Sequence, residues 1–587
     1  MSSNNAPIYW DPEKPWGNEL VANTLVERGV ECIFCLTGDH IAPMLTAIAQ
    51  KGIKVVGTRT EAAAVLAAAG YAMTAGKTGV ACITAGMLGF AQAAMLSVTW
   101  GQVPVVVIAG ASETYADGMR ALQEIDQKPI AQTAQVKEAF HCTKWERIPQ
   151  MITWAFKSAH SGIPGCAFID IPIDVLCSQG DPTALGKYKT GVIQSAAGGD
   201  PELIQKAVQM LAAAEKPIIN VGRLGAASAA SEEIRQFVEL TGIPVDMCAG
   251  TLGSHPQNLS YLMCFDADVI LTLGKASQGI EGSLNANMYQ GKIIAVYPDA
   301  ADIGRCYPVE LGIVGDVKVV LKQMIEEARK IKFPDRSAWL KELREQQAGS
   351  KAMFLGIAEN NNLPIHPARL IKDTIEWMTE NKLNKEAVMT VDGGDCIYWW
   401  AILSSAYGLP TEFPGQMVGL TSLQLTLGAV GLGLGMAIGS ACARPGKLLL
   451  IPVMGDGALG YHFMELETLA NLNVPAVIVV HNNSAWGMVY ADQRRIWGRT
   501  EHTGSAFSPD LHYEKAAEAL GCAPGEFVQE PAQIRPALEK AYRTARQTNK
   551  PVLVNVITDA NIYIMPFPWW NLPATDKGEP FSTMGGP

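Results

Sequence analysis

Short apolar runs alternate with longer amphipathic or alanine-rich stretches along most of this chain. A short apolar run bounded by glycine or proline is typical of a strand buried on both faces, and the longer stretches predict helices. This alternation repeats in three blocks and predicts an α/β fold of three doubly wound parallel-sheet domains. At 587 residues the chain is long enough for them, and we place the domains at residues 1–185, 186–350 and 351–587.

The first and third blocks share a similar order of elements. In the first block we expect helices at 18–28, 41–50 and 61–75 and strands at 30–36, 54–57, 79–84, 103–109 and 167–172. In the second we expect strands at 217–221, 244–246, 269–273 and 292–296, a helix at 231–241 and a helical connector at 337–351. In the third we expect strands at 388–391, 448–454 and 474–480 and a helix at 458–472.

Three further segments lack this regular pattern. The uncharged stretch 418–443 is long enough to cross a membrane, but its repeated glycines favour a closely packed, buried helix. The hydrophilic stretch 178–200 is typical of a linker. The proline-rich, aromatic segment 565–570 predicts a covering tail.

Composition limits the classes of partner and the compartment. The formal net charge of -11 and the lack of basic clusters argue against nucleic-acid or anionic-membrane binding. The 12 cysteines are scattered through apolar segments, and the N-terminal sequence lacks a basic-then-apolar signal, so we expect a reducing, cytoplasmic setting. Cys32 and Cys35 have redox spacing, but we expect them to be buried in a strand.

The most informative motif joins the ends of two expected strands. Gly455-Asp456-Gly457 follows one apolar run directly, and Asn482-Asn483 ends the next strand-like run, with Asp456 and Asn483 27 positions apart. Ligands of open α/β sheets bind at the carboxyl ends of the strands. A carboxylate, an amide and a helix N-terminus would suit a divalent cation and a diphosphate. The alternative is an ordinary strand-to-helix turn.

This spacing resembles that of the thiamine diphosphate (ThDP) enzyme family. The resemblance implies that Asp456, Asn483 and the carbonyl of Ala485 bind Mg²⁺. It also implies a cofactor-binding set that comprises Gly393, Gly394, Gly428, Val430, Gly455, Asp456, Gly457, Ala458, Asn483, Ala485, Trp486, Gly487 and Met488. Within the set, Gly393 and Gly394 would approach the diphosphate, and Val430 would lie under the bent cofactor.

Glu61 has two interpretations. With Thr58 as the N-cap residue, Glu61 three positions later would complete a capping box. Its alanine-rich surroundings would instead leave its carboxyl poorly solvated, with a raised pKa. The resemblance implies the second role, in which Glu61 hydrogen-bonds the pyrimidine ring of the cofactor and so promotes formation of the ylid.

Four further stretches are Gly38-Asp39-His40-Ile41, Thr84-Ala85-Gly86, Leu122-Gln123 and Trp486-Gly487. They resemble benzaldehyde lyase, within the acetolactate synthase and 2-hydroxyacyl-CoA lyase group. The similarity places His40 as a proton relay and Gln123 as a hydrogen-bond partner of the substrate carbonyl. Asp39 stands where benzaldehyde lyase has a small residue, and we count it with the catalytic group. Met488 stands where that enzyme has alanine, which predicts a differently shaped pocket.

Together these residues predict a ThDP- and Mg²⁺-dependent lyase or carboligase. It would cleave or form 2-hydroxy ketones through ylid attack on a carbonyl, with an aldehyde as its small-molecule partner. The alternatives are a 2-hydroxyacyl-CoA lyase and an acetolactate-synthase-like or 2-oxoacid-decarboxylating enzyme. The family further implies a homo-oligomer, a dimer of dimers with each active site between two chains. Arg223 in a glycine loop leaves FAD or ADP/CoA open for the central domain.

Overall fold

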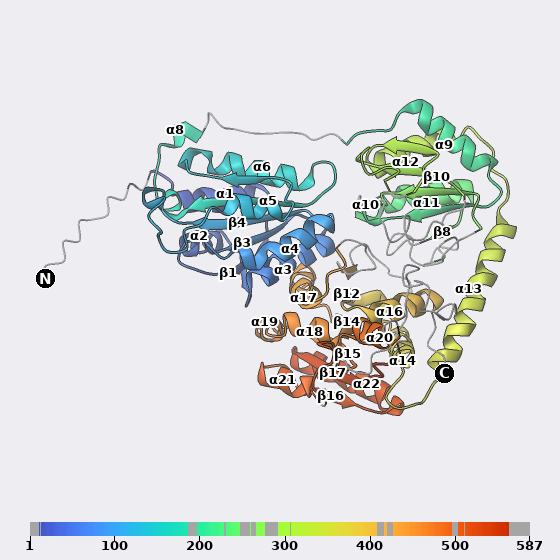
Figure 1. The fold of residues 1–587 in the computed structure, drawn as a ribbon. Coiled ribbons are helices and arrows are strands. Elements are labelled where there is room, and N and C mark those ends of the chain that lie inside the picture. Colours follow the sequence, from blue (N-terminus) through green and yellow to red (C-terminus); the bar gives the residue numbers. More distant parts are fainter. Residues whose placement is uncertain are drawn as a thin grey trace. The chain divides into compact units, whose positions relative to one another are not determined.

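The computed structural model contains three parallel sheets in two compact units (Figure 1). Unit 1 comprises residues 1–72 and 77–194, and unit 2 comprises 73–76 and 195–587. The structure describes residues 11, 13–185, 196–227, 230–246, 257, 259, 266–275, 291–305, 307–407, 416–418, 427–495, 503–509 and 511–562. The predicted α/β class with three parallel-sheet domains is confirmed, whereas the proposed domain boundaries stay a prediction.

The sheet of unit 1 has six strands in the order β2-β1-β3-β4-β6-β5. These strands are β1 (Cys32–Leu36), β2 (Lys54–Gly57), β3 (Gly79–Ile83), β4 (Val105–Ala111), β5 (Ala139–His141) and β6 (Cys166–Pro172). Its helices are α1 (Gly17–Glu27), α2 (Ala42–Gln50), α3 (Glu61–Ala75), α4 (Leu88–Trp100), α5 (Gln127–Thr133), α6 (Ile148–His160), α7 (Ile173–Leu176) and α8 (Pro182–Leu185).

Side-chain alternation along β1 explains why this strand is apolar on both faces. Ile33 and Cys35 belong to one buried cluster with residues of α1, α2 and α6. Phe34 points to the opposite face, where its ring lies 6.0 Å from that of Tyr71 on α3. Cys32 and Cys35 are both buried in this strand and form no disulfide, which confirms their expected burial in a strand.

Unit 2 contains a five-stranded sheet in the order β11-β10-β9-β7-β8. Its strands are β7 (Pro217–Val221), β8 (Val245–Asp246), β9 (Val269–Leu273), β10 (Lys292–Tyr297) and β11 (Leu311–Val314). The helices of this region are α9 (Pro201–Ala213), α10 (Arg223–Ala227), α11 (Ser231–Thr241), α12 (Val317–Ala328) and the long α13 (Ser337–Ala358).

The second sheet of unit 2 has the order β13-β12-β14-β15-β17-β16, the same pattern as the sheet of unit 1. Its strands are β12 (Val388–Thr390), β13 (Met417–Val418), β14 (Leu449–Gly455), β15 (Ala476–Asn482), β16 (Glu526–Val528) and β17 (Pro551–Ile557). Its helices are α14 (Pro367–Glu380), α15 (Leu383–Glu386), α16 (Asp395–Ala406), α17 (Gly433–Ala443), α18 (Asp456–Tyr461), α19 (Glu465–Asn471), α20 (Gly487–Arg495), α21 (Tyr513–Ala519) and α22 (Pro531–Thr548).

Two predicted helices differ from the structure. The single helix expected at 458–472 is wrong, because α18 ends at Tyr461 and α19 begins at Glu465. Gly457 and Gly460 lower the helix propensity of this segment, because each glycine inside a helix costs free energy relative to alanine. Of the segment expected to be helical at 418–443, the described residues form a helix only at Gly433–Ala443, while Met417–Val418 form a strand and residues 427–432 are not helical, with Gly428 and Gly431 at positive φ.

Two expectations concern the rest of the chain. Within the described residues, the structure has no helix that is both long and apolar enough to span a membrane. The tail predicted at 565–570 and part of the linker predicted at 178–200 lie outside the described residues.

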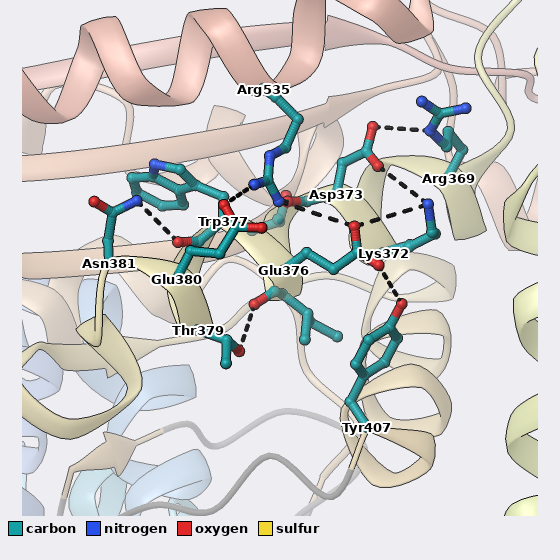
Figure 2. Close-up of polar contacts among 12 residues, drawn as sticks. Arg369, Lys372, Asp373, Glu376, Trp377, Thr379, Glu380, Asn381, Tyr407 and Arg535 are labelled. Carbon is teal, nitrogen blue, oxygen red and sulfur yellow. Dashed lines mark hydrogen bonds and ion pairs between the residues drawn. The ribbon is translucent and has the colours of Figure 1, made fainter.

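A partly buried ionic network anchors the C-terminal end of α16 (Figure 2). Tyr407 is the C-cap residue of this helix, and its hydroxyl donates to Glu376 Oε1 at 2.7 Å. Lys372 lies 3.8 Å from the other Glu376 oxygen and 3.7 Å from Asp373 on α14, and Arg535 of α22 donates to the Asp373 carbonyl at 3.3 Å. The network holds α14, α16 and α22 together, and α16 begins at the expected cofactor site.

Candidate active site

Asp456 emerges from β14 as a buried carboxylate with one free oxygen. The ladder between β14 and β15 is irregular between Ile451 and Met454, at Pro452, which has no N–H to contribute. Asp456 is 2% exposed, and its Oδ1 accepts from the Gly457 N–H at 2.9 Å. Its Oδ2 is buried without a partner among the described residues. Burial raises the pKa of Asp456 to about 7, and hydrogen bonds from nearby backbone N–H groups offset part of this rise.

The two asparagines after β15 have different environments. The Asn482 amide donates to Asn555 Oδ1 at 3.0 Å, and its oxygen accepts from the Ser484 N–H at 3.0 Å. Asn482 is fully buried, and these hydrogen bonds hold the turn after β15 together. Asn483 Oδ1 accepts from the Ala485 N–H at 3.2 Å, so the second asparagine and Ala485 lie together beside the Asp456 turn.

Glycine residues allow these loops to approach one another closely. A Cβ atom at Gly457 would lie 2.5 Å from the Trp486 ring, and one at Gly487 would lie 2.5 Å from Asn483 Nδ2. A Cβ atom at Gly394 would lie 3.3 Å from Met488 Sδ. The structure therefore brings the turns after β12, β14 and β15 together, and these carry most of the predicted cofactor-binding residues. Ala458 lies in the first turn of α18 and is buried.

Asp392 is a site residue that the sequence analysis missed. Its fully buried carboxylate accepts from the Gly433 N–H at 2.6 Å and the Gly431 N–H at 3.2 Å. It thereby ties the end of β12, next to Gly393, to the turn that carries Gly428 and Val430. Burial raises the pKa of Asp392 to about 6. An acid directly after a strand and before two glycines was the available signal, because Asp456 has nearly the same context.

In unit 1, Glu61 is the first residue of α3 and does not form the capping box that was the alternative. The Thr58 N–H donates to the Cys35 carbonyl at 2.8 Å, so it is not the partner of Glu61. Thr60 caps the helix instead, since its hydroxyl accepts from the Ala63 N–H at 3.1 Å. Glu61 is 6% exposed, and burial raises the pKa of its carboxyl. A hydrogen bond from its own backbone N–H offsets part of this rise.

His40 and Gln123 lie at the carboxyl edge of the same sheet. A Cβ atom at Gly110, near the end of β4, would lie 2.7 Å from the Cβ of His40, which is buried. A Cβ atom at Gly86, after β3, would lie 2.8 Å from the Cβ of Gln123. Gln123 has φ near 60°, an uncommon conformation for a residue other than glycine. Asp39 is exposed beside His40.

The central sheet carries two cationic residues at its carboxyl edge. Arg223 follows β7, and Lys275 follows β9; a Cβ atom at Gly222 would lie 2.3 Å from the Lys275 Cα. Burial lowers the pKa of Arg223 to about 10. Lys275 donates to Asn220 Oδ1 at 3.2 Å.

The described residues contain no group of three His, Cys, Asp or Glu side chains that could hold a metal ion. The expected magnesium site is of a different kind, because it combines one carboxylate, one amide and one backbone carbonyl. Such hard oxygen ligands, supplemented by phosphate and water, suit Mg²⁺. The partnerless Asp456 Oδ2 and the glycine-lined turns fit a cation and a diphosphate.

Models of known protein families match a segment in each of the three sheet-containing regions of the chain. Residues 15–130 match the N-terminal TPP binding domain of thiamine pyrophosphate enzymes, residues 204–324 match their central domain, and residues 401–556 match their C-terminal TPP binding domain. A probable acetolactate synthase large subunit of Methanocaldococcus jannaschii is 28% identical over 572 residues, which cover 92% of each chain. The 2-hydroxyacyl-CoA lyase 1 of Mus musculus is 27% identical over 93% of this chain and 94% of its own. The chain therefore belongs to the thiamine pyrophosphate enzyme family.

Proposed function

We propose that this enzyme uses ThDP and Mg²⁺ to cleave or form the carbon–carbon bond of 2-hydroxy ketones, with aldehydes as products or substrates. The observation that carries the proposal is the environment of Glu61. Its buried carboxyl has a raised pKa and does not form a capping box with Thr58. His40 and Gln123 lie at the same sheet edge and supply a second group of polar side chains.

The metal and the diphosphate would be held by unit 2. Asp456, Asn483 and the carbonyl of Ala485 would bind the cation, and Gly393 and Gly394 would let the backbone approach the diphosphate. The N-terminus of α16 begins directly after these glycines and favours negative charge. Asp392 would hold the turn that carries Val430 in place.

ThDP, when bound, supplies a carbon nucleophile and an electron sink for cleavage next to a carbonyl. Glu61 would keep a proton on its buried carboxyl and donate it to the pyrimidine ring. His40 would accept and return the proton of the substrate hydroxyl, a role that suits imidazole near neutral pH. Gln123 would orient the substrate oxygen through a hydrogen bond, and the exposed Asp39 would lie at the rim.

A second candidate is a 2-hydroxyacyl-CoA lyase. Relatives with that name are 26–28% identical to this chain, and Arg223 with Lys275 could receive a phosphate-bearing group in the central domain, such as that of CoA, ADP or FAD. An acetolactate-synthase-like or 2-oxoacid-decarboxylating reaction is the third candidate, because two relatives named probable acetolactate synthase large subunit are 28% and 29% identical to this chain.

A substrate panel separates these functions. Purified enzyme supplied with ThDP and Mg²⁺ would be assayed with benzoin, acetoin, pyruvate and a 2-hydroxyacyl-CoA. We expect cleavage of a 2-hydroxy ketone to aldehydes. Turnover of pyruvate alone would contradict the lyase proposal, and turnover of the CoA thioester alone would favour the second candidate.

The proposed assembly is a cytoplasmic dimer of dimers in which two chains complete each site. The chain's net charge of -11 and its lack of basic clusters support small-molecule substrates rather than nucleic acid. Light scattering of the purified protein at several concentrations tests the assembly. A monomer that retains full activity would contradict a shared site.

A further inference from the structure

The turn after β15 is held by a chain of buried hydrogen bonds that ends on a carboxylate. The Ser484 N–H donates to Asn482 Oδ1 at 3.0 Å, and the Asn482 amide donates to Asn555 Oδ1 at 3.0 Å. Asn555 Nδ2 in turn donates to Glu514 Oε2 at 2.9 Å and to the Leu511 carbonyl at 3.0 Å. Both asparagines are fully buried and Glu514 is 1% exposed, so the chain is shielded from water.

The register of the strands puts both asparagines on one face of the sheet. Asn555 on β17 pairs with Val480 on β15, and Asn482 lies two residues beyond Val480. Because side chains alternate along a strand, Asn482 and Asn555 are diagonal neighbours on the same face. Their sequence neighbours Val479 and Val554 pack on the opposite face, in the cluster formed with α14, α16 and α22.

The buried carboxylate determines which way both amides point. A carboxylate and a backbone carbonyl only accept hydrogen bonds, so the Asn555 atom that faces Glu514 and Leu511 must be its amide nitrogen. The Asn555 oxygen then faces Asn482 and requires a donor there. Asn482 consequently presents its own oxygen to the Ser484 N–H.

Glu514 is itself fixed from two sides. Its Oε1 lies 2.7 Å from Nδ1 of His512, whose ring centroid lies 4.6 Å from that of Phe527 on β16. A Cβ atom at Gly525 would lie 2.7 Å from the Glu514 Cβ, so the glycine lets α21 pack closely on the sheet. The carboxylate is therefore a fixed end point for the chain of amides.

The other end of the chain holds a backbone conformation that serine rarely adopts. Ser484 has a φ of 53°, in the left-handed region where a side chain costs free energy. Its N–H and its hydroxyl both donate to Asn482 Oδ1, at 3.0 and 3.3 Å. Ser484 separates Asn483 from Ala485, the two residues after β15 that are proposed to bind the cation. Its conformation therefore sets the direction of the backbone between them.

We propose that Asn555 is a positioning residue for the cation site. It anchors Asn482 to the Glu514 carboxylate, and Asn482 holds Ser484 in the left-handed conformation before a cation binds. Hydrogen-bonded partners behind metal ligands typically change metal affinity by about 10–100-fold. The effect on the cation rests on the proposed function, whereas the conformation of Ser484 in the cofactor-free protein does not.

Hydrogen exchange in the full-length, cofactor-free protein tests the conformation. We expect the Ser484 amide to exchange about tenfold faster in Asn555→Leu than in wild type, because Asn482 loses its anchor. Gln416, just before β13 in the same sheet, is also fully buried and donates to two backbone carbonyls, at 2.7 and 3.1 Å. Gln416→Leu is therefore a matched control that should leave this exchange unchanged. Unchanged exchange in Asn555→Leu, or an equal rise in both variants, would overturn the proposal.

Calorimetric titration with ThDP and Mg²⁺ provides a second readout. We expect Asn555→Leu to raise the Kd by about tenfold or more and Gln416→Leu to leave it unchanged. Adding Ser484→Gly to Asn555→Leu should recover part of the affinity, because glycine adopts positive φ without steric cost. A loss that Ser484→Gly does not reduce would overturn the proposal. If the wild type binds no ThDP in the presence of Mg²⁺, the proposed function fails, and hydrogen exchange still decides the role of Asn555.

Discussion

Two glycines of α18 give a test of how tightly the cofactor turns are packed. Gly457 and Gly460 lie three residues apart in one short helix, and neither has positive φ. A Cβ atom at Gly457 would lie 2.5, 2.7 and 3.1 Å from three atoms of the Trp486 ring. A Cβ atom at Gly460 would meet nothing within 4 Å. The two alanine substitutions therefore add the same methyl group to tight and to open space.

The expected effects have opposite signs. Gly460→Ala should be neutral or should stabilise the protein by up to about 1 kcal/mol, because alanine restricts the unfolded chain more than glycine does. Gly457→Ala should cost about 1–3 kcal/mol, because Trp486 must move and its neighbours limit that movement. The Trp486 ring makes edge-on contacts with Tyr461 and Phe507, at centroid distances of 6.1 and 5.3 Å.

Displacement of Trp486 should also disturb the adjacent Asp456 turn and weaken ThDP binding. A loss of about 1.4 kcal/mol in binding corresponds to a tenfold rise in Kd. Thermal unfolding of the apo protein and calorimetric titration with ThDP and Mg²⁺ would measure both effects. Equal unfolding midpoints and equal Kd values for the two variants would refute the packing described here.

Three further predictions concern single side chains. Glu61→Gln should lower turnover by at least about 10²-fold. The substitution should also stabilise the apo protein, and this gain should grow as the pH rises above 4.5. The reason is that burial raises the pKa of Glu61, so its ionised form opposes folding. Full turnover, or a stability gain that grows towards acid pH, would contradict this role. Asn482→Ala should cost about 1–3 kcal/mol in urea unfolding, since it leaves Asn555 and Ser484 without their partner; an unchanged midpoint would show that the pair is unimportant. Met488→Ala should raise kcat/KM for aromatic over small aldehydes by about tenfold, as the side chain next to Gly394 is shortened; an unchanged ratio would place Met488 outside the substrate pocket.

The elements that the sequence predicted best are those with clear local signals at both ends. Helix α3 begins at Glu61 and ends at Ala75, as expected, because an alanine-rich run fills it and Gly76 at positive φ follows it. Strands β7 and β9 also have the expected bounds, since each is a short, fully buried apolar run. Periodicity and punctuation were sufficient in these segments.

The errors occurred where tertiary contacts override local pattern. The break between α18 and α19 and the late start of α17 lie in glycine-rich segments that pack around the Asp456 and Asp392 turns. The role of Asp392 depends on N–H groups about 40 positions away, at Gly431 and Gly433, which no local pattern reveals. The cap at Thr60 was missed because Thr58 and Glu61 have capping-box spacing, yet Thr58 bonds to β1 instead.

The central claim is that Asp456 holds a cation that anchors the diphosphate of ThDP. Calorimetric titration of the metal-free protein with ThDP, with and without Mg²⁺, tests it most directly when wild type is compared with Asp456→Asn. We expect wild type to bind ThDP tightly only when Mg²⁺ is present, and the variant to lose that Mg²⁺ dependence together with most of the affinity. Equal ThDP affinity in both proteins, or in the absence of any divalent cation, would contradict the claim.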